Sequence, residues 1–451
     1  SVKSRGLGDV YKRQGDYLMP KVLPDNTSQH HDGNRFPKAS DYGLTKGYTD
    51  AANYHSPDIF TAEREAVFKQ SWLCVGQLKD LPENGDYIRK QIPVLDASII
   101  VVRGNDGTVR AFYNHCTHRG VPLIEEENGN ARSFRCPYHG WHFDNQGVLR
   151  GIPCEEDFPH IDKSKNGLLA LPLDTWNGFI FVYPQTEPGE SLRQFLGEVA
   201  EVFDDLPLEK FRHGFRFELA MDCNWKFMVN AFNEGYHLPF LHSKTLKSQT
   251  ATPENPHIHY HNPRYYGSHS VSTLERNYAW KPSGVVKSFV LGIAPEAHSH
   301  SITGKNETRD IATHPGVNPS KVKNFMMDQL MIFPNTQIQL MLNGYLVHQF
   351  WPVAPDKMIM QTAIYGATKP ESYREEFAAI YMQASGRDVV TEDSSLSILQ
   401  QKTLKSGKIK KLYFGENEPN LRFFAKQLDN KIASAKIKPV SYTHLTLPTI
   451  L

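Results

Sequence analysis

The chain has 451 residues, of which 39% are hydrophobic and 22% charged, and 50 Lys and Arg against 49 Asp and Glu leave a net charge of +1. This length suffices for about two or three globular domains that each bury a core, which excludes a disordered or fibrous chain. Charge this close to balance provides no basic surface for nucleic acid or an anionic membrane. A small substrate is therefore the expected partner.

The cysteine content points to a reducing compartment. Five cysteines in so long a chain cannot form a disulfide framework, and the odd count leaves at least one unpaired. No apolar stretch approaches the roughly 18 residues that a membrane-spanning helix needs, and no segment has the zones of a secretory signal. We expect a cytoplasmic protein without a membrane span.

The two ends of the chain match neither neighbouring pattern. Residues 1–14 and 440–451 resemble translated sequencing-adapter read-through and are predicted to be non-native tails, with native flexible termini as the alternative. Residues 15–53 are polar and interrupted by Gly, Pro and Asn, which predicts an extended N-terminal arm.

Residues 54–186 are predicted to form a first domain. Ser56 is a good N-cap and Pro57 suits the first helical position, so a helix should begin here. From residue 85 to 183, short β-branched and aromatic runs are separated by turns such as Asn105-Asp106-Gly107. This spacing predicts a small antiparallel β domain.

Residues 190–439 are predicted to form a larger second domain that mixes helices and strands, an α+β arrangement. Residues 243–330 show little periodicity, and we expect a lid or pocket wall there. We expect its histidines, from His257 to His314, to be lid or surface residues. The predicted elements are helices at 192–203, 224–237, 373–383 and 392–404, a strand at 215–223, and a hairpin within 337–351 that turns at Asn343-Gly344.

A first group of metal-binding residue types lies in the β domain. Cys116 and His118 form a C-x-H motif, and Cys136 and His139 form a C-x-x-H motif. Two Cys and two His could hold a tetrahedral zinc ion. The paired order also suits a Rieske [2Fe-2S] centre, in which both thiolates bind one iron and both imidazoles the other.

A second group lies in residues 224–242. Glu234 and His237 are three residues apart and would share one face of a helix. His237 and His242 are five apart, so they converge only if the helix is interrupted, and Pro239 could supply the break. Two imidazoles and one carboxylate form the metal site of non-haem Fe(II) oxygenases.

Both groups carry a family resemblance. The segments Cys116–Gly120 and Cys136–Trp141 resemble the Rieske signature. The run from N-W-K at residue 224 to E-x-Y-H-x-x-x-x-H, ending at residue 242, is similar to the mononuclear iron motif of the large (alpha, catalytic) subunit of Rieske-type, aromatic-ring-hydroxylating oxygenases. The resemblance implies a small antiparallel β Rieske domain followed by a helix-grip, START-like catalytic domain with a curved antiparallel sheet.

The same resemblance implies the ligands. Cys116, His118, Cys136 and His139 would hold the cluster, and His237 and His242 the mononuclear iron. The segment E-D-x-x-L at residues 392–396 resembles the family's C-terminal motif, in which Asp393 would be the third iron ligand. Glu392 is the competing ligand, and an Asp that only favours a helix N-terminus is the other alternative.

Partners and electron flow also follow from the resemblance. Glu234 would link His237 to a cluster histidine of a neighbouring subunit, which implies a ring-shaped homotrimer, with or without β subunits. Asn233 and Tyr236 would tune the iron site. O2 would be the co-substrate, with electrons from NAD(P)H delivered by a separate reductase, directly or through a ferredoxin. No dinucleotide-binding fingerprint occurs in this chain.

Three functions are open at this point. The resemblance favours hydroxylation of an aromatic ring compound, and Phe227, Phe232 and Phe240 could line an apolar pocket or belong to the core. A monooxygenase or demethylase of a quaternary or methylated amine is the alternative enzyme. A non-catalytic Rieske electron carrier fused to a ligand-binding domain is the alternative of another class.

Overall fold

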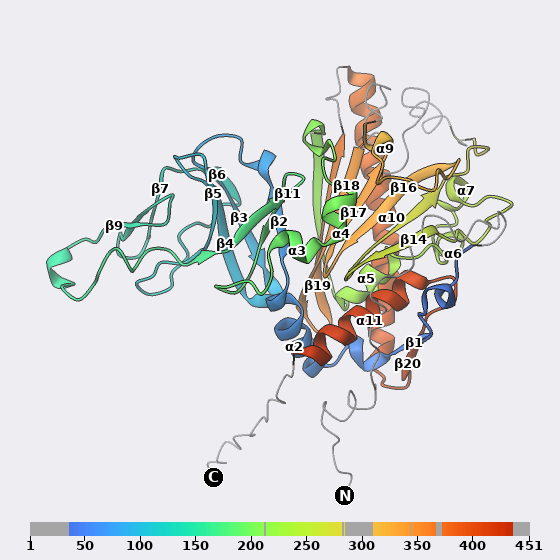
Figure 1. Ribbon diagram of the computed structural model, residues 1–451, viewed down its shortest axis with the longest axis horizontal. Coiled ribbons are helices and arrows are strands. Elements are labelled where there is room, and N and C mark those ends of the chain that lie inside the picture. Colours follow the sequence, from blue (N-terminus) through green and yellow to red (C-terminus); the bar gives the residue numbers. More distant parts are fainter. Residues whose placement is uncertain are drawn as a thin grey trace, which may run out of the picture.

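The computed structural model describes residues 36–211, 213–281, 284, 310–342, 344–366 and 372–435. A slender β-rich arm projects from a larger body in which helices pack on a broad sheet (Figure 1). The predicted terminal tails, residues 15–35 of the predicted arm, Asn343, His298 and His300 lie outside the described residues.

The β-rich arm is the predicted first domain without its leading helix. It contains a five-stranded sheet ordered β10-β5-β4-β3-β6, a three-stranded sheet β7-β8-β9 and a three-stranded sheet β11-β12-β2, all antiparallel. The strands are β2 (Leu73–Gln77), β3 (Asp86–Ile92), β4 (Ala97–Arg103), β5 (Val109–Tyr113), β6 (Asn128–Asn130), β7 (Ser133–Arg135), β8 (His142–Asp144), β9 (Leu149–Gly151), β10 (Ala170–Leu171), β11 (Leu173–Trp176) and β12 (Phe179–Val182).

The body is built on a seven-stranded antiparallel sheet ordered β13-β19-β18-β17-β16-β15-β14. Its strands are β13 (His213–Met221), β14 (His261–Tyr266), β15 (His269–Glu275), β16 (Phe325–Ile332), β17 (Thr336–Met341), β18 (Gly344–Ala354) and β19 (Lys357–Gly366). Its helices are α3 (Leu192–Leu196), α4 (Glu198–Val202), α5 (Trp225–Ala231), α6 (Leu238–Leu241), α7 (Lys247–Thr250), α9 (Asp310–Thr313), α10 (Tyr373–Leu404) and α11 (Pro419–Ser434).

Both faces of the large sheet are covered, so every residue of β16 and β17 is buried. On one face, Leu340 belongs to the same apolar cluster as Phe195 of α3 and Phe179 of β12; we call this the outer face. On the other, Met341 belongs to the same apolar cluster as Leu238 of α6 and Val389 of α10; we call this the inner face. The fold is therefore the α+β architecture that the resemblance implies.

The N-terminal segment ties the chain together. β1 (Tyr48–Asp50), in the predicted N-terminal arm of residues 15–53, pairs with β20 (Lys411–Tyr413). Helix α2 (Pro57–Ala66) begins as predicted, because the Ser56 side chain accepts from the Ile59 amide. Its residue Glu63 is buried against α5, where it pairs with Lys226 and accepts from the Trp225 indole at 3.0 Å. The predicted leading helix therefore braces the catalytic body.

Several element boundaries differ from the prediction. The predicted lid or pocket wall at 243–330 contains β14, β15 and most of β16. Every side chain of β15 and β16 is buried, so these two strands lack a simple alternation. His269 of this segment, expected at the surface, is buried and bonded to the Phe195 carbonyl at 2.8 Å. The predicted helix at 192–203 is divided at Gly197, where φ is 53°.

The two predicted C-terminal helices form one continuous helix, α10, of 32 residues. The hairpin predicted within 337–351 is confirmed as the antiparallel pair β17 and β18. Among the helices of the described residues, none combines the length and apolar character that crossing a bilayer requires.

The outer face also meets the β-rich arm. A cavity of about 530 Å³ lies between them, and its walls include Lys90 of β3 and Gln349 and Gln361 of the large sheet. Gln361 donates to Glu218 at 2.6 Å.

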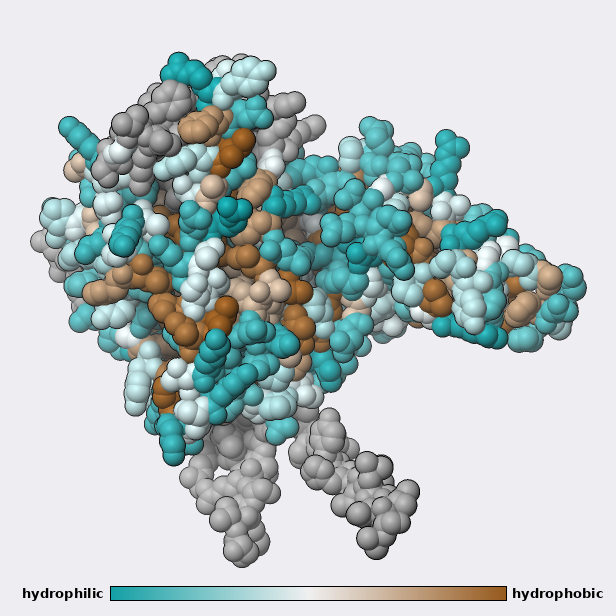
Figure 2. Space-filling view, turned by 180° about the vertical axis from the view of Figure 1, so that it is seen from behind, coloured by the Kyte–Doolittle hydropathy of each residue, from teal (hydrophilic) through white to brown (hydrophobic). Residues whose placement is uncertain are grey.

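Seen from behind, the β-rich arm is mainly hydrophilic, whereas hydrophobic surface is concentrated on the body (Figure 2).

Candidate metal centres

The two cysteine and histidine motifs form a pair of matching loops in the arm. One follows β5, and the other connects β7 to β8. Each loop closes with a hydrogen bond from a glycine amide to the cysteine carbonyl four residues earlier, Gly120 to Cys116 at 2.9 Å and Gly140 to Cys136 at 3.0 Å. Both glycines have positive φ, 75° and 73°, which explains why glycine stands there.

The loops bring the four predicted cluster residues together. The His118 and His139 rings lie 4.8 Å apart, and the indole of Trp141 stacks on His118 at 4.7 Å. Cys116 and Cys136 are buried, with 1% and 3% of their surface exposed. Burial raises the pKa of the Cys116 thiol to about 11, while the His118 and Arg119 backbone N–H groups act in the opposite direction. Those N–H groups stabilise a thiolate once a cation is present.

The buried imidazole atoms show that these residues suit a bound metal group. The Nδ1 atoms of His118 and His139 are both buried, and neither has a hydrogen-bond partner among the described residues. Buried ring nitrogens are rarely left without a partner. Two such nitrogens beside two buried thiols fit the donor set of a [2Fe-2S] cluster with two Cys and two His ligands.

A second donor set lies in the body, on both sides of the short helix α6. His237 is the N-cap of this helix and His242 its C-cap. Their rings lie 5.1 Å apart. The pair converges because a single helical turn separates them. Pro239 occupies the first turn of α6, where its missing N–H costs nothing, so it begins the helix rather than breaking it as predicted.

Asp393 reaches this pair from α10. Its Oδ1 lies 3.0 Å from His242 Nε2 and 3.4 Å from His237 Nε2. The three ligand atoms all lie within 4.8 Å of one another. Asp393 is 20 residues from the start of α10, so the alternative of a helix N-terminal Asp is wrong.

Each histidine has a carboxylate on its other ring nitrogen. Glu234 contacts Nδ1 of His237 and accepts from the His237 amide at 3.1 Å. Glu392 contacts Nδ1 of His242 at 2.6 Å and accepts from the Thr245 hydroxyl at 2.7 Å. Glu392 therefore lies behind His242, on the side away from the Nε2 atoms. Carboxylates in this position orient histidine ligands of metals.

The electrostatics of the site favour a cation. Burial would lower the pKa of His237, but the charge of Glu234 and the contact with Asp393 raise it to about 10. Burial would raise the pKa of Asp393, but hydrogen bonds with His237 and His242 lower it. Positive charge is thus stabilised between these groups, as a metal with two imidazole ligands and one carboxylate ligand requires.

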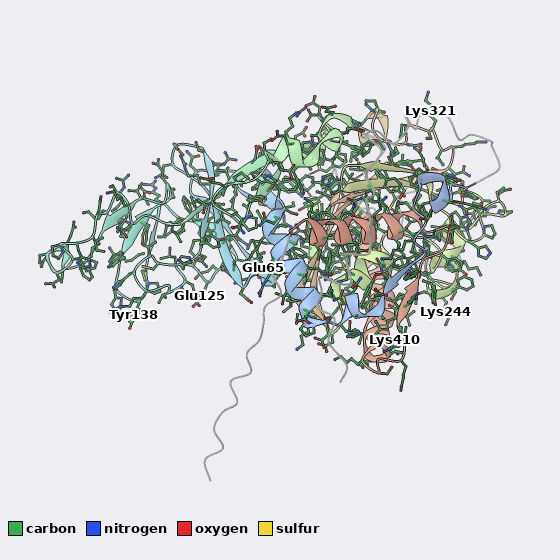
Figure 3. All side chains as sticks on the ribbon, turned by 60° about the horizontal axis from the view of Figure 1, so that its bottom comes forward. Glu65, Glu125, Tyr138, Lys244, Lys321 and Lys410 are labelled. Atoms are coloured by element: carbon green, nitrogen blue, oxygen red, sulfur yellow. The ribbon has the colours of Figure 1, made fainter. Side chains whose placement is uncertain are left out.

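The two centres lie at opposite ends of one chain. The β7–β9 sheet is at the tip of the arm, and α6 is on the far side of the body (Figure 1). Tyr138, beside the cluster residue His139, and Lys244, just after His242, are also at opposite ends in a second view (Figure 3). Direct electron transfer within one chain would therefore have to cross the molecule.

Both parts of the chain match known families. Residues 71–169 match the Rieske [2Fe-2S] domain, and residues 208–434 match the ring hydroxylating alpha subunit (catalytic domain). The chain belongs to the Rieske oxygenase alpha-subunit family. Its cofactors are therefore a Rieske cluster and a mononuclear iron that uses O2, and the zinc alternative is excluded.

Individual relatives of this Rieske oxygenase subunit act on different compounds. The 2-aminobenzenesulfonate 2,3-dioxygenase subunit alpha of Alcaligenes sp is 26% identical over 387 residues, 82% of this chain and 88% of the relative. Several further relatives, at 31% to 34% identity, align over only 35% to 49% of their own length.

Solved structures show the same fold. Naphthalene 1,2-dioxygenase from Rhodococcus sp. has a TM-score of 0.68 at 19% identity, over 87% of this chain and 98% of that one. A quaternary ammonium Rieske monooxygenase, described with carnitine oxidation and inter-subunit electron transfer, has a TM-score of 0.67 at 20% identity, over 85% and 95%.

The other predicted site residues of this oxygenase subunit are not part of the described donor set. Asn233 is buried and donates to the Val229 carbonyl at 2.7 Å, which stabilises the end of α5. Tyr236 is 49% exposed and packs against Phe240, which is 63% exposed. Phe227 packs in the core against Tyr54. Of the three predicted pocket phenylalanines, Phe232 alone lies beside polar inner-face residues, with its ring 4.6 Å from His348.

The sequence reasoning missed two supports of the iron site. Thr245 positions Glu392, and the Tyr260 hydroxyl donates to the Glu234 carbonyl at 2.9 Å. Thr245 follows His242 by three residues, a spacing that could have been noticed. Tyr260 lies in the predicted lid or pocket wall, and no local pattern relates it to Glu234.

Proposed function

We propose that this subunit hydroxylates a small aromatic compound, using O2 and electrons that a separate reductase passes from NAD(P)H, directly or through a ferredoxin. The observation that carries this proposal is the pairing of a Cys2His2 loop pair with a His2Asp site in one chain. A Rieske electron carrier needs only the Cys2His2 loop pair. The non-catalytic alternative leaves His237, His242 and Asp393 without a purpose.

In this proposal, the chain's own residues divide the work. Cys116, His118, Cys136 and His139 hold the cluster, which supplies single electrons. His237, His242 and Asp393 hold the iron, which supplies O2 activation when bound. Glu234 and Glu392 orient the two histidines and keep their Nε2 atoms directed at the metal. We assign residues 54–186 and 190–439 to the two domains, with helix α2 of the first segment packed against the second.

Electrons would pass between subunits. Glu234 is only 9% exposed, and it is already bonded to His237. The cluster loops of the same chain lie at the other end of the molecule (Figure 3). A cluster histidine of a neighbouring chain would complete the link in a ring-shaped homotrimer, with or without β subunits. Support comes from the related structure that was described with inter-subunit electron transfer.

The function is tested with the purified chain and a Rieske oxygenase reductase. Three irons per chain and NADH-driven O2 uptake that rises with an aromatic substrate are expected. Two irons per chain, or O2 uptake that no compound raises across aromatic acids, polycyclic aromatics and methylated amines, would contradict the proposal.

Electron transfer between chains is tested by co-expression. A chain with Cys136→Ala lacks a cluster, and a chain with Asp393→Ala lacks the iron, so neither should be active alone. Mixed trimers of both should recover part of the activity if electrons cross between chains. Inactive mixed trimers, shown to have formed by differently tagged chains, would refute the inter-subunit path.

A second candidate is oxidation of a quaternary or methylated amine. The quaternary ammonium monooxygenase shares the fold, and the carnitine monooxygenase oxygenase subunit of Escherichia coli (strain K12) is 33% identical over 185 residues. Carnitine and γ-butyrobetaine in the same O2-uptake assay distinguish this candidate from the aromatic one.

A further inference from the structure

A group of buried polar side chains lies on the inner face of the large sheet, beside the proposed iron site. Gln329 of β16 and Gln339 of β17 are directly opposite each other in the strand register. They are 6% and 3% exposed. Neither Oε1 atom has a hydrogen-bond partner among the described residues. Two unpaired, buried acceptors at adjacent positions are costly unless something donates to them.

The orientation of the Gln339 amide is fixed by its neighbours. Gln337 Nε2 donates to the Phe232 carbonyl at 2.6 Å, and a carbonyl oxygen can only accept. The Gln337 oxygen must then point the other way, where it accepts from Gln339 Nε2 at 3.1 Å. The Gln339 oxygen is consequently the atom without a partner. Exchanging the O and N positions of the Gln339 amide would break this series of hydrogen bonds.

The Gln329 amide is fixed in a similar manner. Its Nε2 donates to the Met327 sulfur at 3.9 Å, and a thioether sulfur can only accept. The Gln329 oxygen is therefore the atom without a partner. The nearby Tyr260 hydroxyl donates to the Glu234 carbonyl at 2.9 Å.

Gln339 is therefore linked, through Gln337, to the Phe232 carbonyl in the segment that carries the proposed iron histidines. Gln329, directly opposite Gln339 in the strand register, leaves its own oxygen unpaired beside it. Around them, Met327 and Met341 share an apolar cluster with Leu238, next to His237, and with Val389, one turn before Asp393. The oxygens thus lie in an apolar environment between the sheet and the iron-binding elements.

We infer that Gln329 and Gln339 form a subsite for a neutral NH2 group on the substrate, such as the amino group of an aromatic amine. Two opposed acceptors match the two donors of one NH2 group. A neutral group is favoured over an ammonium because both oxygens are uncharged and the surroundings are buried. A quaternary ammonium has no N–H to donate. This inference rests on the proposed function and narrows its substrate class.

The test compares aniline with toluene, which differ by NH2 in place of CH3. Dissociation constants are measured by calorimetry on the iron-loaded enzyme without O2, and kcat/KM with the reductase. The wild type should favour aniline by at least about tenfold in both. Gln339→Met and Gln329→Met keep the side-chain length but remove the acceptors, so each should reduce the preference severalfold, with toluene unaffected.

Gln361→Met is the matched control, because Gln361 lies on the outer face of the same sheet, with its side chain bonded to Glu218. It should keep the wild-type preference. Equal affinity of the wild type for both compounds, binding of neither, or a preference that survives in both inner-face variants would overturn the subsite. Such a result, obtained with three irons per chain and substrate-stimulated O2 uptake, would leave the proposed function standing; loss of those two properties would refute both.

Discussion

The cluster loops and the iron site show two ways of assembling a metal centre. All four cluster residues lie between Cys116 and His139, on two loops that each close on a glycine. The proposed iron site combines His242 with Asp393, 151 positions later in the chain. The first centre therefore depends on local turn geometry. The second depends on α10 lying correctly against α6, so packing far from the metal contributes to it.

The supports of the two centres differ accordingly. At the proposed cluster site, backbone N–H groups and a stacked indole surround the residues, and the imidazole Nδ1 atoms have no hydrogen-bond partner in the described part of the chain. Around the iron site, each histidine is held by a carboxylate, Glu234 or Glu392. Substitutions at the cluster site should affect only that site. Iron binding at the other site should weaken gradually as the residues behind its ligands are substituted.

The largest expected effect is the loss of the mononuclear iron while the cluster is retained. Asp393→Ala removes the carboxylate that reaches both Nε2 atoms, so the mononuclear iron should be lost and turnover should fall below detection. Iron per chain should drop from three to two, with the visible spectrum of the cluster unchanged. The exposed Asp388 of the same helix provides the control, Asp388→Ala. Full iron content in Asp393→Ala would refute the assignment of this ligand.

The reverse separation is expected from Cys136→Ala. Loss of one buried thiolate should abolish the cluster and its visible spectrum, and with it NADH-driven turnover. The iron site, in another part of the fold, should still bind close to one iron per chain. Cys154, which is exposed and outside the loops, gives the control Cys154→Ala. Simultaneous loss of both metals in Cys136→Ala would show that the centres are not independent.

A smaller effect is expected where the two centres are proposed to communicate. Glu234→Gln keeps a polar group beside His237 but removes the negative charge. Both metals should stay bound, while turnover should decrease at least about tenfold. Stopped-flow reoxidation of the reduced cluster should slow in parallel. Glu254→Gln, at an exposed position, is the control and should keep the wild-type turnover. Unchanged turnover in Glu234→Gln would contradict the bridging role.

The mildest effect is expected behind His242. In Glu392→Gln the amide can still accept from the imidazole, but its charge no longer stabilises the metal-bound ring. Iron affinity should weaken by roughly tenfold to a hundredfold, as measured by competition with a chelator. Glu376→Gln, at an exposed position on the same helix, is the control and should keep the wild-type iron affinity. If Glu392→Gln released the iron completely, Glu392 would be acting as a ligand.

Local sequence was a good guide wherever a short pattern carries its own geometry. Ser56-Pro57 marked the start of α2, and Asn105-Asp106-Gly107 separates β4 from β5. The two cluster motifs could be paired without a structure because each contains its own turn. The pattern failed in β15 and β16, because strands buried on both faces have no alternation of polar and apolar residues.

The sequence by itself determined the residue types for both metal centres, the helix start at Ser56 and the β character of the first domain, because short-range spacing and turn residues encode them. Only the tertiary structure decided that α10 brings Asp393 to the histidines while Glu392 lies behind His242. It also decided that Gln329 and Gln339 oppose each other beside the iron-binding elements. These relations depend on strand register and helix packing between segments far apart in the chain, which no local pattern contains.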